Sequence, residues 1–305
     1  MPEQEAPGSW LYYMRRGEFE QAWQRTDADL AARAGQPCWH LPRHLQYVWD
    51  GRPLAGRRVL VRCYHGLGDT IQFIRYLPLL KAVAAEVIVW AQPELLPLLA
   101  TAAGIDQLLP LHDGTPDAAY DADVEIMELP HVFRTTLATI PQAIPYLHAA
   151  PRRLAATQAG QRLVGLVWQA GGWDARRSVP FALLAPLAAV PGVQLIILQA
   201  NAEAAGWQAG VGLNPGEFSL ADYARVVRGL DLLITVDSMP AHLAGALGVP
   251  VWTLLHAAAD WRWLAGRADS PWYPTMRLFW QEAPGEWGPV VAQVREELRG
   301  YSEVT

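Results

Sequence analysis

The chain has 305 residues, about twice the length of a typical domain, so we expect two domains. Hydrophobic residues make up 51% of the sequence, which excludes a largely disordered protein. A formal net charge of -6 argues against general binding to nucleic acid or to an anionic membrane surface. The two cysteines show no metal-ligand spacing and favour a reducing compartment. With no secretory signal and no apolar run of membrane-spanning length, the sequence predicts a cytoplasmic protein; peripheral attachment at the inner membrane stays open.

Residues 1–56 predict a short helical segment followed by an irregular lead-in. Apolar residues recur at helical spacing between Trp10 and Ala34, and Gly17 divides this stretch into a short helix and a longer one. The lead-in that follows is rich in Pro, Trp and His, so we expect no regular structure there.

Residues 57–150 alternate between strand and helix patterns, which predicts an open, mostly parallel sheet with helices on both faces. The predicted strands are 59–62, 86–91, 107–111 and 123–129, and the predicted helices are 71–83 and 93–104.

The pattern restarts after a connection at 145–153, so residues 151–284 predict a second domain of the same kind. Its predicted strands are 162–169, 193–200, 232–236 and 251–255, and its predicted helices begin near Pro180, Ser219 and Met239. Residues 285–305 predict a final helix, which we expect to pack back on the first domain. The architecture expected is therefore two doubly wound domains with a cleft between them.

Ligands bind beyond the carboxyl ends of parallel strands, so the turns after strands are candidate sites. In the first turn, HGLGDT, Gly66 and Gly68 allow a close backbone approach, and Asp69 lies at the start of a helix. Asp69 is a candidate general base; the alternative is a carboxylate that only caps the helix.

The second turn, VWQAGGWDARRS, exposes backbone N–H groups at Gly171 and Gly172, and Arg176 and Arg177 add guanidinium donors suited to phosphate. The alternative is a solvated basic loop that is capped by Ser178.

The third turn, DSMPAH, places Asp237, Ser238 and His242 around the start of a helix, where free N–H groups and the helix dipole favour an anion. The alternative gives these residues structural roles, with Ser238 as a cap, Asp237 as a brace of the turn and His242 as an ordinary histidine.

With these turns in place, the chain resembles glycosyltransferase family 9, the ADP-heptose:lipopolysaccharide heptosyltransferases, and within it a branch associated with tetratricopeptide repeats. The matching blocks are GLGDTIQFIRYLPLL, VGLVW with RRSVPFALLAPL, DLLITVDSMPAHLAGALGVPVWTLL and DWRWLAGRADSPWYPTMRLFWQ. The resemblance implies the α/β GT-B fold, built from two Rossmann-like domains. Residues 17–35 look like the remnant of one repeat helix, too short to form a stacked array.

The resemblance also implies roles for individual residues. Asp69 matches the aspartate that deprotonates the acceptor hydroxyl. Donor binding is implied for Gln169, Ala170, Gly171, Arg177, Asp222, Asp237, Ser238, Met239, Pro240 and His242, and the acceptor side for His65, Gly68 and Gln72.

Some positions depart from the family pattern. Gln169 and Ala170 stand where heptosyltransferases often have threonines, and Arg177 stands where they have a lysine. Ala221 stands at the position of the ribose-binding glutamate, with Asp222 beside it. Tyr64 and His65 replace a Glu-Gln pair that the branch leads us to expect.

The function implied is inverting, metal-independent transfer of a sugar from a nucleotide-diphosphate donor to a glycan, lipid-linked or protein acceptor, with no cofactor beyond the donor. The alternative is a non-catalytic module that binds a nucleotide sugar or a glycan. A dinucleotide oxidoreductase is disfavoured because GLGD lacks the third glycine of its fingerprint. The rings of Trp261, Trp263, Trp272 and Tyr273 form either a platform for a sugar or part of the core.

Overall fold

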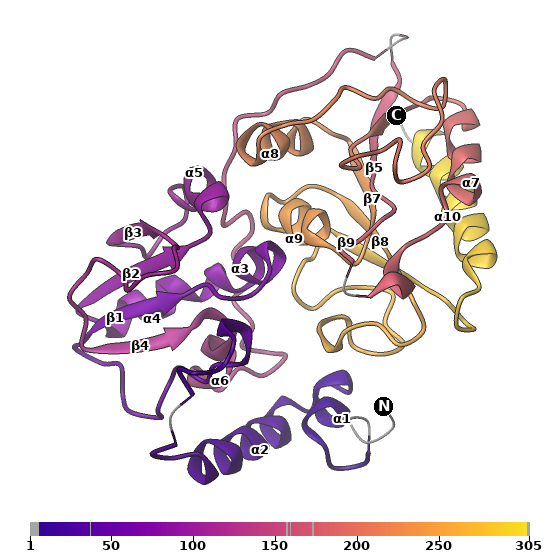
Figure 1. The fold of residues 1–305 in the computed structure, drawn as a ribbon. Coiled ribbons are helices and arrows are strands. Elements are labelled where there is room, and N and C mark those ends of the chain that lie inside the picture. The colour runs from indigo at the N-terminus through magenta and orange to yellow at the C-terminus, as the bar shows by residue number, and fades with distance from the viewer. Residues whose placement is uncertain (1–5, 37, 157, 159, 173, 304–305) are drawn as a thin grey trace. The chain divides into compact units, whose positions relative to one another are not determined.

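The computed structural model describes residues 6–36, 38–156, 158, 160–172 and 174–303. The chain divides into two compact units, residues 1–148 and residues 149–305 (Figure 1). No helix in the described ranges combines the length and the hydropathy that crossing a bilayer requires.

The first unit is built on a sheet of four parallel strands in the order β3-β2-β1-β4. The strands are β1 (Arg58–Arg62), β2 (Glu86–Ala91), β3 (Gln107–Pro110) and β4 (Ala122–Glu125). The prediction of a strand over 123–129 is wrong beyond Glu125. There the Glu125 carboxylate accepts a hydrogen bond from the backbone N–H of Met127 (2.7 Å), which caps a helical turn instead.

Helical segments follow β1, β2 and β4 of this sheet. They are α3 (Leu67–Phe73), η3 (Ile74–Tyr76), α4 (Leu77–Val83), η4 (Pro93–Leu95), α5 (Leu96–Leu99), η5 (Ile126–Glu128) and α6 (Leu129–Val132). The helix predicted over 71–83 begins earlier and is interrupted, because Pro78 has no N–H to donate to the carbonyl of Ile74. One face of the sheet, with Leu60, Ile88 and Trp90, packs against side chains of residues 109–120, a segment without a helix.

The N-terminal segment belongs to the first unit. It contains α1 (Trp10–Arg15), α2 (Phe19–Ala32) and η2 (Arg43–Leu45). Gly17 adopts a φ of +74° and separates α1 from α2 as predicted. The indole of Trp23 donates a hydrogen bond to the carbonyl of Thr135 (2.7 Å), and the Arg134 guanidinium pairs with Asp27 and holds the pKa of that carboxyl below its usual value. These contacts attach α2 to the chain beyond α6.

The second unit is built on five parallel strands in the order β6-β5-β7-β8-β9. The strands are β5 (Arg162–Leu166), β6 (Val193–Ile197), β7 (Leu232–Val236), β8 (Val251–Leu255) and β9 (Met276–Trp280). The helices are η6 (Ala175–Arg177), α7 (Phe181–Leu184), η7 (Ala185–Ala189), α8 (Leu220–Arg228), α9 (Met239–Ala246), η8 (Trp261–Trp263) and α10 (Trp287–Glu303). Strands β7 and β8 have the predicted bounds, whereas β9 was not predicted.

The final helix, α10, packs on the second unit and not on the first, which corrects the prediction from the sequence. Its apolar side chains Trp287, Val290, Val294 and Leu298 are buried in the same core as strands β5 to β7, and α10 lies beside α7 (Figure 1). The Tyr301 hydroxyl donates to the carbonyl of Asp231 (2.7 Å) and fixes the end of the helix there. The buried apolar face therefore completes the core of its own unit.

Inside α9, the ring of Tyr273 leaves no room for a side chain at Gly245. A Cβ atom on Gly245 would lie 2.3 Å from the Tyr273 ring. We expect Gly245→Ala to destabilise the second unit by about 1–3 kcal/mol through overpacking, measured by thermal or urea unfolding. Gly300→Ala, in α10 with nothing within 4 Å of the added Cβ, is the matched control and should stabilise the protein by about 0.5–1 kcal/mol. An equal response at the two positions would contradict this packing.

Candidate functional site

The second unit contains a cavity of about 310 Å³ beyond the carboxyl ends of β5, β6 and β7. The part of the lining that offers polar side chains or open backbone comes from the three segments that follow these strands. It includes Gln169, Gly171, Gln199 and Ser238. The remaining wall, mostly apolar, is Val167, Leu198, Ala200, Gly216, Glu217, Phe218, Leu220, Tyr223, Met239 and Pro240. Five predicted donor-site residues, Gln169, Gly171, Ser238, Met239 and Pro240, thus line one cavity.

The side chain of Gln199 holds one of the turns that line the cavity. The Gln199 Oε1 atom accepts hydrogen bonds from the backbone N–H groups of Trp168 (3.1 Å) and Gln169 (2.8 Å). Because Gln199 follows β6 and the two donors follow β5, this side chain sets the path of the β5 turn. Gly171, further along that turn, meets nothing within 4 Å of an added Cβ, so its backbone is open to a ligand.

The start of α9 forms another wall. Ser238 occupies the N-cap position as predicted, but its side chain makes no capping hydrogen bond. Its hydroxyl instead donates to the carbonyl of Val236 (3.2 Å). The positive end of the α9 dipole is therefore left without a side-chain cap at the edge of the cavity, which is the arrangement that favours a bound anion.

Arg177 joins the turns that follow β5 and β7. One guanidinium nitrogen donates to the carbonyl of Asp237 (2.9 Å) and another to the carbonyl of Gly171 (3.4 Å). The residue is only 8% exposed and is not part of the cavity lining. In this structure it braces both turns, whereas the sequence predicted a contact with the donor.

Asp237 lies directly before α9 and is buried. Desolvation and the nearby carboxylate of Asp260 raise the pKa of Asp237 to about 6, although Trp263 and Arg177 act in the opposite direction. The carboxyl group therefore carries a proton for part of the time near neutral pH, and in that form it can donate as well as accept a hydrogen bond.

His242 and the aromatic block are packed in the interior. The Nδ1 atom of His242 lies 3.0 Å from the Tyr273 hydroxyl, and its ring stacks on Trp263 at a centroid distance of 5.3 Å. Trp261, Trp263, Trp272 and Tyr273 are all buried, and His242 does not line the cavity. Of the two uses open for these rings, the structure favours core packing.

Asp222 and Ala170 lie beside the cavity. The Asp222 side chain, 41% exposed, accepts a hydrogen bond from Arg225 (3.2 Å), while its neighbour Tyr223 lines the cavity. The backbone N–H of Ala170 donates to the Ser178 hydroxyl (3.2 Å), so the Ser178 side chain holds the two ends of this loop together.

Several lining residues were not predicted, above all Gln199, Glu217, Phe218 and Tyr223. The Glu217 carboxylate accepts a hydrogen bond from the backbone N–H of Asn201 (2.9 Å), which links the approach to α8 with the end of β6. Burial and the Glu217 charge raise the pKa of the Tyr223 phenol. Part of this lining could have been predicted from the segment Gly216–Leu220, because it lies between a buried strand and the body of the next helix.

The first unit holds the predicted base and the predicted acceptor-side residues. Asp69 lies at the third position of α3, and its Oδ2 accepts a hydrogen bond from the backbone N–H of Gly66 (2.9 Å). Gly68 is in the same turn of helix. His65 Nδ1 lies 3.0 Å from the Glu125 carboxylate, and Gln72 is fully buried. The capping alternative for Asp69 is thus observed, and the half-buried carboxylate keeps an oxygen, Oδ1, outside that contact.

No cluster of three or more His, Cys, Asp or Glu side chains suited to a metal ion occurs among the described residues.

Comparison with known sequences identifies the region that contains much of this cavity. Residues 196–284 match the sequence model of glycosyltransferase family 9 (heptosyltransferase). The match confirms the resemblance to this family over these residues and supports the predicted enzyme class, a glycosyltransferase. The association with tetratricopeptide repeats stays a prediction.

A curated relative is Protein FlbA of Caulobacter vibrioides, 28% identical over 94% of this chain. The alignment takes in 53% of that protein, so the chain spans about half the length of its relative.

Solved structures of low sequence identity share the fold. The E. coli ADP-heptose lps heptosyltransferase II has a TM-score of 0.56 at 16% identity, with 80% of this chain and 98% of that chain covered. The E. coli heptosyltransferase WaaC with ADP-2-deoxy-2-fluoro heptose has a TM-score of 0.51 at 14% identity, with 79% and 99% covered. A family 9 protein from Veillonella parvula has a TM-score of 0.51 at 14% identity, with 83% and 91% covered. The predicted α/β GT-B fold is confirmed.

Proposed function

We propose that the chain transfers a sugar from a nucleotide-diphosphate donor, bound in the cavity of the second unit, to an acceptor hydroxyl. The observation that carries this proposal is the cavity itself. It combines the uncapped start of α9 and the open backbone of Gly171 with an apolar wall from Phe218 to Tyr223. A phosphate suits the first two features and a nucleobase suits the third.

Within the cavity, each part of the donor has a suitable wall. The base would lie against Phe218 and Leu220, and the Glu217 carboxylate can accept hydrogen bonds from ribose hydroxyls. The diphosphate would lie at Ser238, near the α9 dipole. WaaC, which shares the fold, is solved with an ADP-sugar, which makes adenine nucleotides the first donors to examine.

The chemistry proposed is inverting and metal-independent. The acceptor oxygen forms a bond to the anomeric carbon, the bond from that carbon to the diphosphate oxygen breaks, and Asp69 takes the proton of the acceptor hydroxyl. The leaving diphosphate carries away the electron pair and is stabilised by the α9 dipole and by backbone N–H groups of the Gly171 turn.

A cytoplasmic location suits this proposal because neither cysteine forms a disulfide. The acceptor is a glycan, a lipid-linked sugar or a protein. A lipid-linked acceptor would bring the chain to the inner membrane.

The donor proposal is tested by thermal unfolding of the full chain with ADP-, UDP- and GDP-sugars. A donor at 100 times its Kd adds about 2.7 kcal/mol of stability, which is a rise in Tm of about 5–11 °C for a domain of this size. Phe218→Ala should abolish most of that rise, because it removes a wall of the cavity.

Leu183→Ala, an equally apolar truncation at an exposed position of α7, is the control and should leave the ligand-induced rise unchanged. If no nucleotide sugar raises Tm, or if Phe218→Ala retains the full rise, the donor cavity is wrongly identified.

A further inference from the structure

The first unit contains a second candidate binding site at its N-terminal helices. Two cavities, of about 410 and 250 Å³, share Arg33, Tyr47 and Trp49 in their walls. Helix α2 and the described lead-in residues 36 and 38–50 form one part of the combined wall, and η5 with α6 form another. We call this pair of cavities the N-terminal groove. Its size lies within the range of small-molecule sites.

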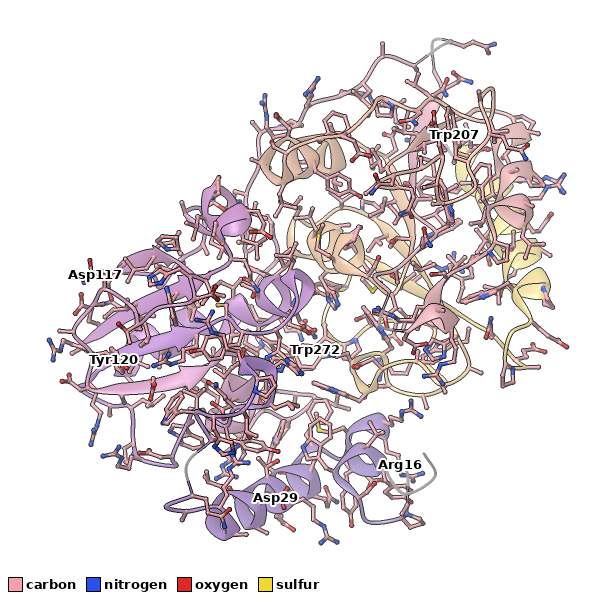
Figure 2. All side chains as sticks on the ribbon, viewed as in Figure 1. Arg16, Asp29, Asp117, Tyr120, Trp207 and Trp272 are labelled. Carbon is pink, nitrogen blue, oxygen red and sulfur yellow. The ribbon has the colours of Figure 1, made fainter. Side chains whose placement is uncertain are left out.

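The wall of the N-terminal groove combines flat aromatic rings with polar groups of both charges. The rings are those of Trp10, Trp23, Tyr47 and Trp49. Asp29, an exposed residue of α2 marked in Figure 2, and Asp50 supply carboxylates. The Arg33 guanidinium lies 3.7 Å from the centroid of the Tyr47 ring. This mixture disfavours both a polyanion and a simple cation, and suits a neutral ligand that is rich in hydroxyl groups.

The groove is connected to the turn that carries Asp69. Glu128, in the groove wall, accepts a hydrogen bond from the backbone N–H of Glu125 (2.8 Å). The Glu125 carboxylate in turn lies 3.0 Å from His65 Nδ1 and accepts from the N–H of Tyr64 (3.3 Å). An unbroken chain of contacts therefore joins the groove to the segment just before Asp69.

The lead-in that forms the groove is fixed by the same carboxylate. Glu128 also accepts hydrogen bonds from the backbone N–H groups of Val48 (3.2 Å) and Trp49 (2.9 Å). Burial raises the pKa of Glu128 to about 7, while hydrogen bonds from the backbone N–H groups of Glu125, Trp49 and Val48 act in the opposite direction. The Trp49 indole donates to the carbonyl of Arg52 (2.9 Å), so its ring is held in place before any ligand binds.

We propose that the N-terminal groove binds the saccharide part of the acceptor. The inference rests on the proposed function, since it assigns the acceptor of that reaction to the same unit as Asp69. Aromatic rings match the apolar faces of pyranose rings, and carboxylate and guanidinium groups pair with vicinal hydroxyls. A short, bounded groove of this volume holds a few sugar residues, whereas docking of a folded protein buries a surface of about 800 Å² on each partner.

A native cysteine reports on occupation of the groove. Cys38 lines it and is half-exposed, whereas Cys63, the other cysteine of the sequence, is fully buried. We would follow alkylation of Cys38 by iodoacetamide in the full chain, with Cys38→Ser as the blank. The probes are neutral di- to tetrasaccharides of glucose, galactose, mannose and N-acetylglucosamine, and peptides of similar mass.

We expect at least one saccharide to slow the alkylation of Cys38 at least fivefold. Tyr47→Ala and Asp29→Asn, both at exposed positions of the wall, should remove this protection. Trp39→Ala is the matched control, because Trp39 is 55% exposed in the same lead-in, as Tyr47 is at 54%, but lies outside the groove wall. The rise in Tm with nucleotide sugars should be unchanged in all three variants.

Absence of protection by every saccharide, protection by peptides alone, or full protection in Tyr47→Ala would each overturn the proposal. The donor measurement separates this failure from failure of the proposed function. Protection of Cys38 without any donor-induced rise in Tm would reject the glycosyltransferase and keep the groove. A donor-induced rise without protection would reject the groove alone.

Discussion

Replacing Asp69 with asparagine should lower kcat by about 10²- to 10⁴-fold and leave the Kd of the nucleotide sugar unchanged. The variant removes the proton acceptor but keeps an oxygen that can accept from the N–H of Gly66, so α3 should keep its first turn. The donor cavity is lined only by residues of the second unit, which the substitution does not touch. Transfer rate and donor affinity, measured on the same preparation, check this expectation.

Asp113→Asn is the control for loss of a carboxylate. Its side chain is fully exposed and outside the cavity wall, so kcat and donor affinity should stay within twofold of wild type. Equal turnover by Asp69→Asn and wild type would remove Asp69 as the base. Donor binding without turnover in wild type, across glycan, lipid-linked and protein acceptors, would favour the non-catalytic alternative, in which Asp69 has a structural role.

Loss of the Arg177 guanidinium should have the second large effect, on stability and donor binding together. Arg177→Leu removes the charge-assisted hydrogen bonds to the carbonyls of Asp237 and Gly171, which we expect to cost about 2–3 kcal/mol. For a domain of this size the loss corresponds to a fall in Tm of about 4–12 °C. Because both turns contribute to the cavity region, we also expect donor affinity to fall at least tenfold.

Arg177→Lys distinguishes a brace from a simple charge. A single ammonium cannot span the two carbonyls as the planar guanidinium does, so the lysine variant should recover only part of the stability. Full recovery of Tm and donor affinity would show that charge alone matters, in line with the lysine that the family resemblance places here. A loss of donor affinity in Arg177→Leu with no change in Tm would indicate direct contact with the donor.

The parts of the fold that the sequence predicts best are the buried parallel strands. The bounds of β2, β7 and β8 agree with the predictions because each is an apolar run between clear turn signals. Strand β9 (Met276–Trp280) was missed, since its apolar residues continue an aromatic block with no break in composition. The placement of α10 was wrong because an amphipathic pattern shows that a face is buried, and says nothing of which core buries it.

The site was predicted where the chain folds locally and missed where distant segments meet. Ser238, Met239 and Pro240 could be found because a strand, a turn and a helix follow one another. Gln199 could not, because its role is to hold the backbone N–H groups of a segment about 30 positions earlier. For His242 the residue type predicts the chemistry of the side chain, whereas its burial against Trp263 is decided by tertiary packing.

The attachment of α2 to residues far along the chain has a consequence for synthesis on the ribosome. The indole of Trp23 donates a hydrogen bond to a carbonyl 112 positions later in the chain. The backbone N–H groups of Val48 and Trp49 donate to Glu128, which lies 80 and 79 positions after them. At translation rates of about 5–20 residues per second, the N-terminal helices spend on the order of ten seconds without their docking surface. During that interval Phe19 and Trp23, buried in the finished protein, are exposed to chaperones and to other nascent chains.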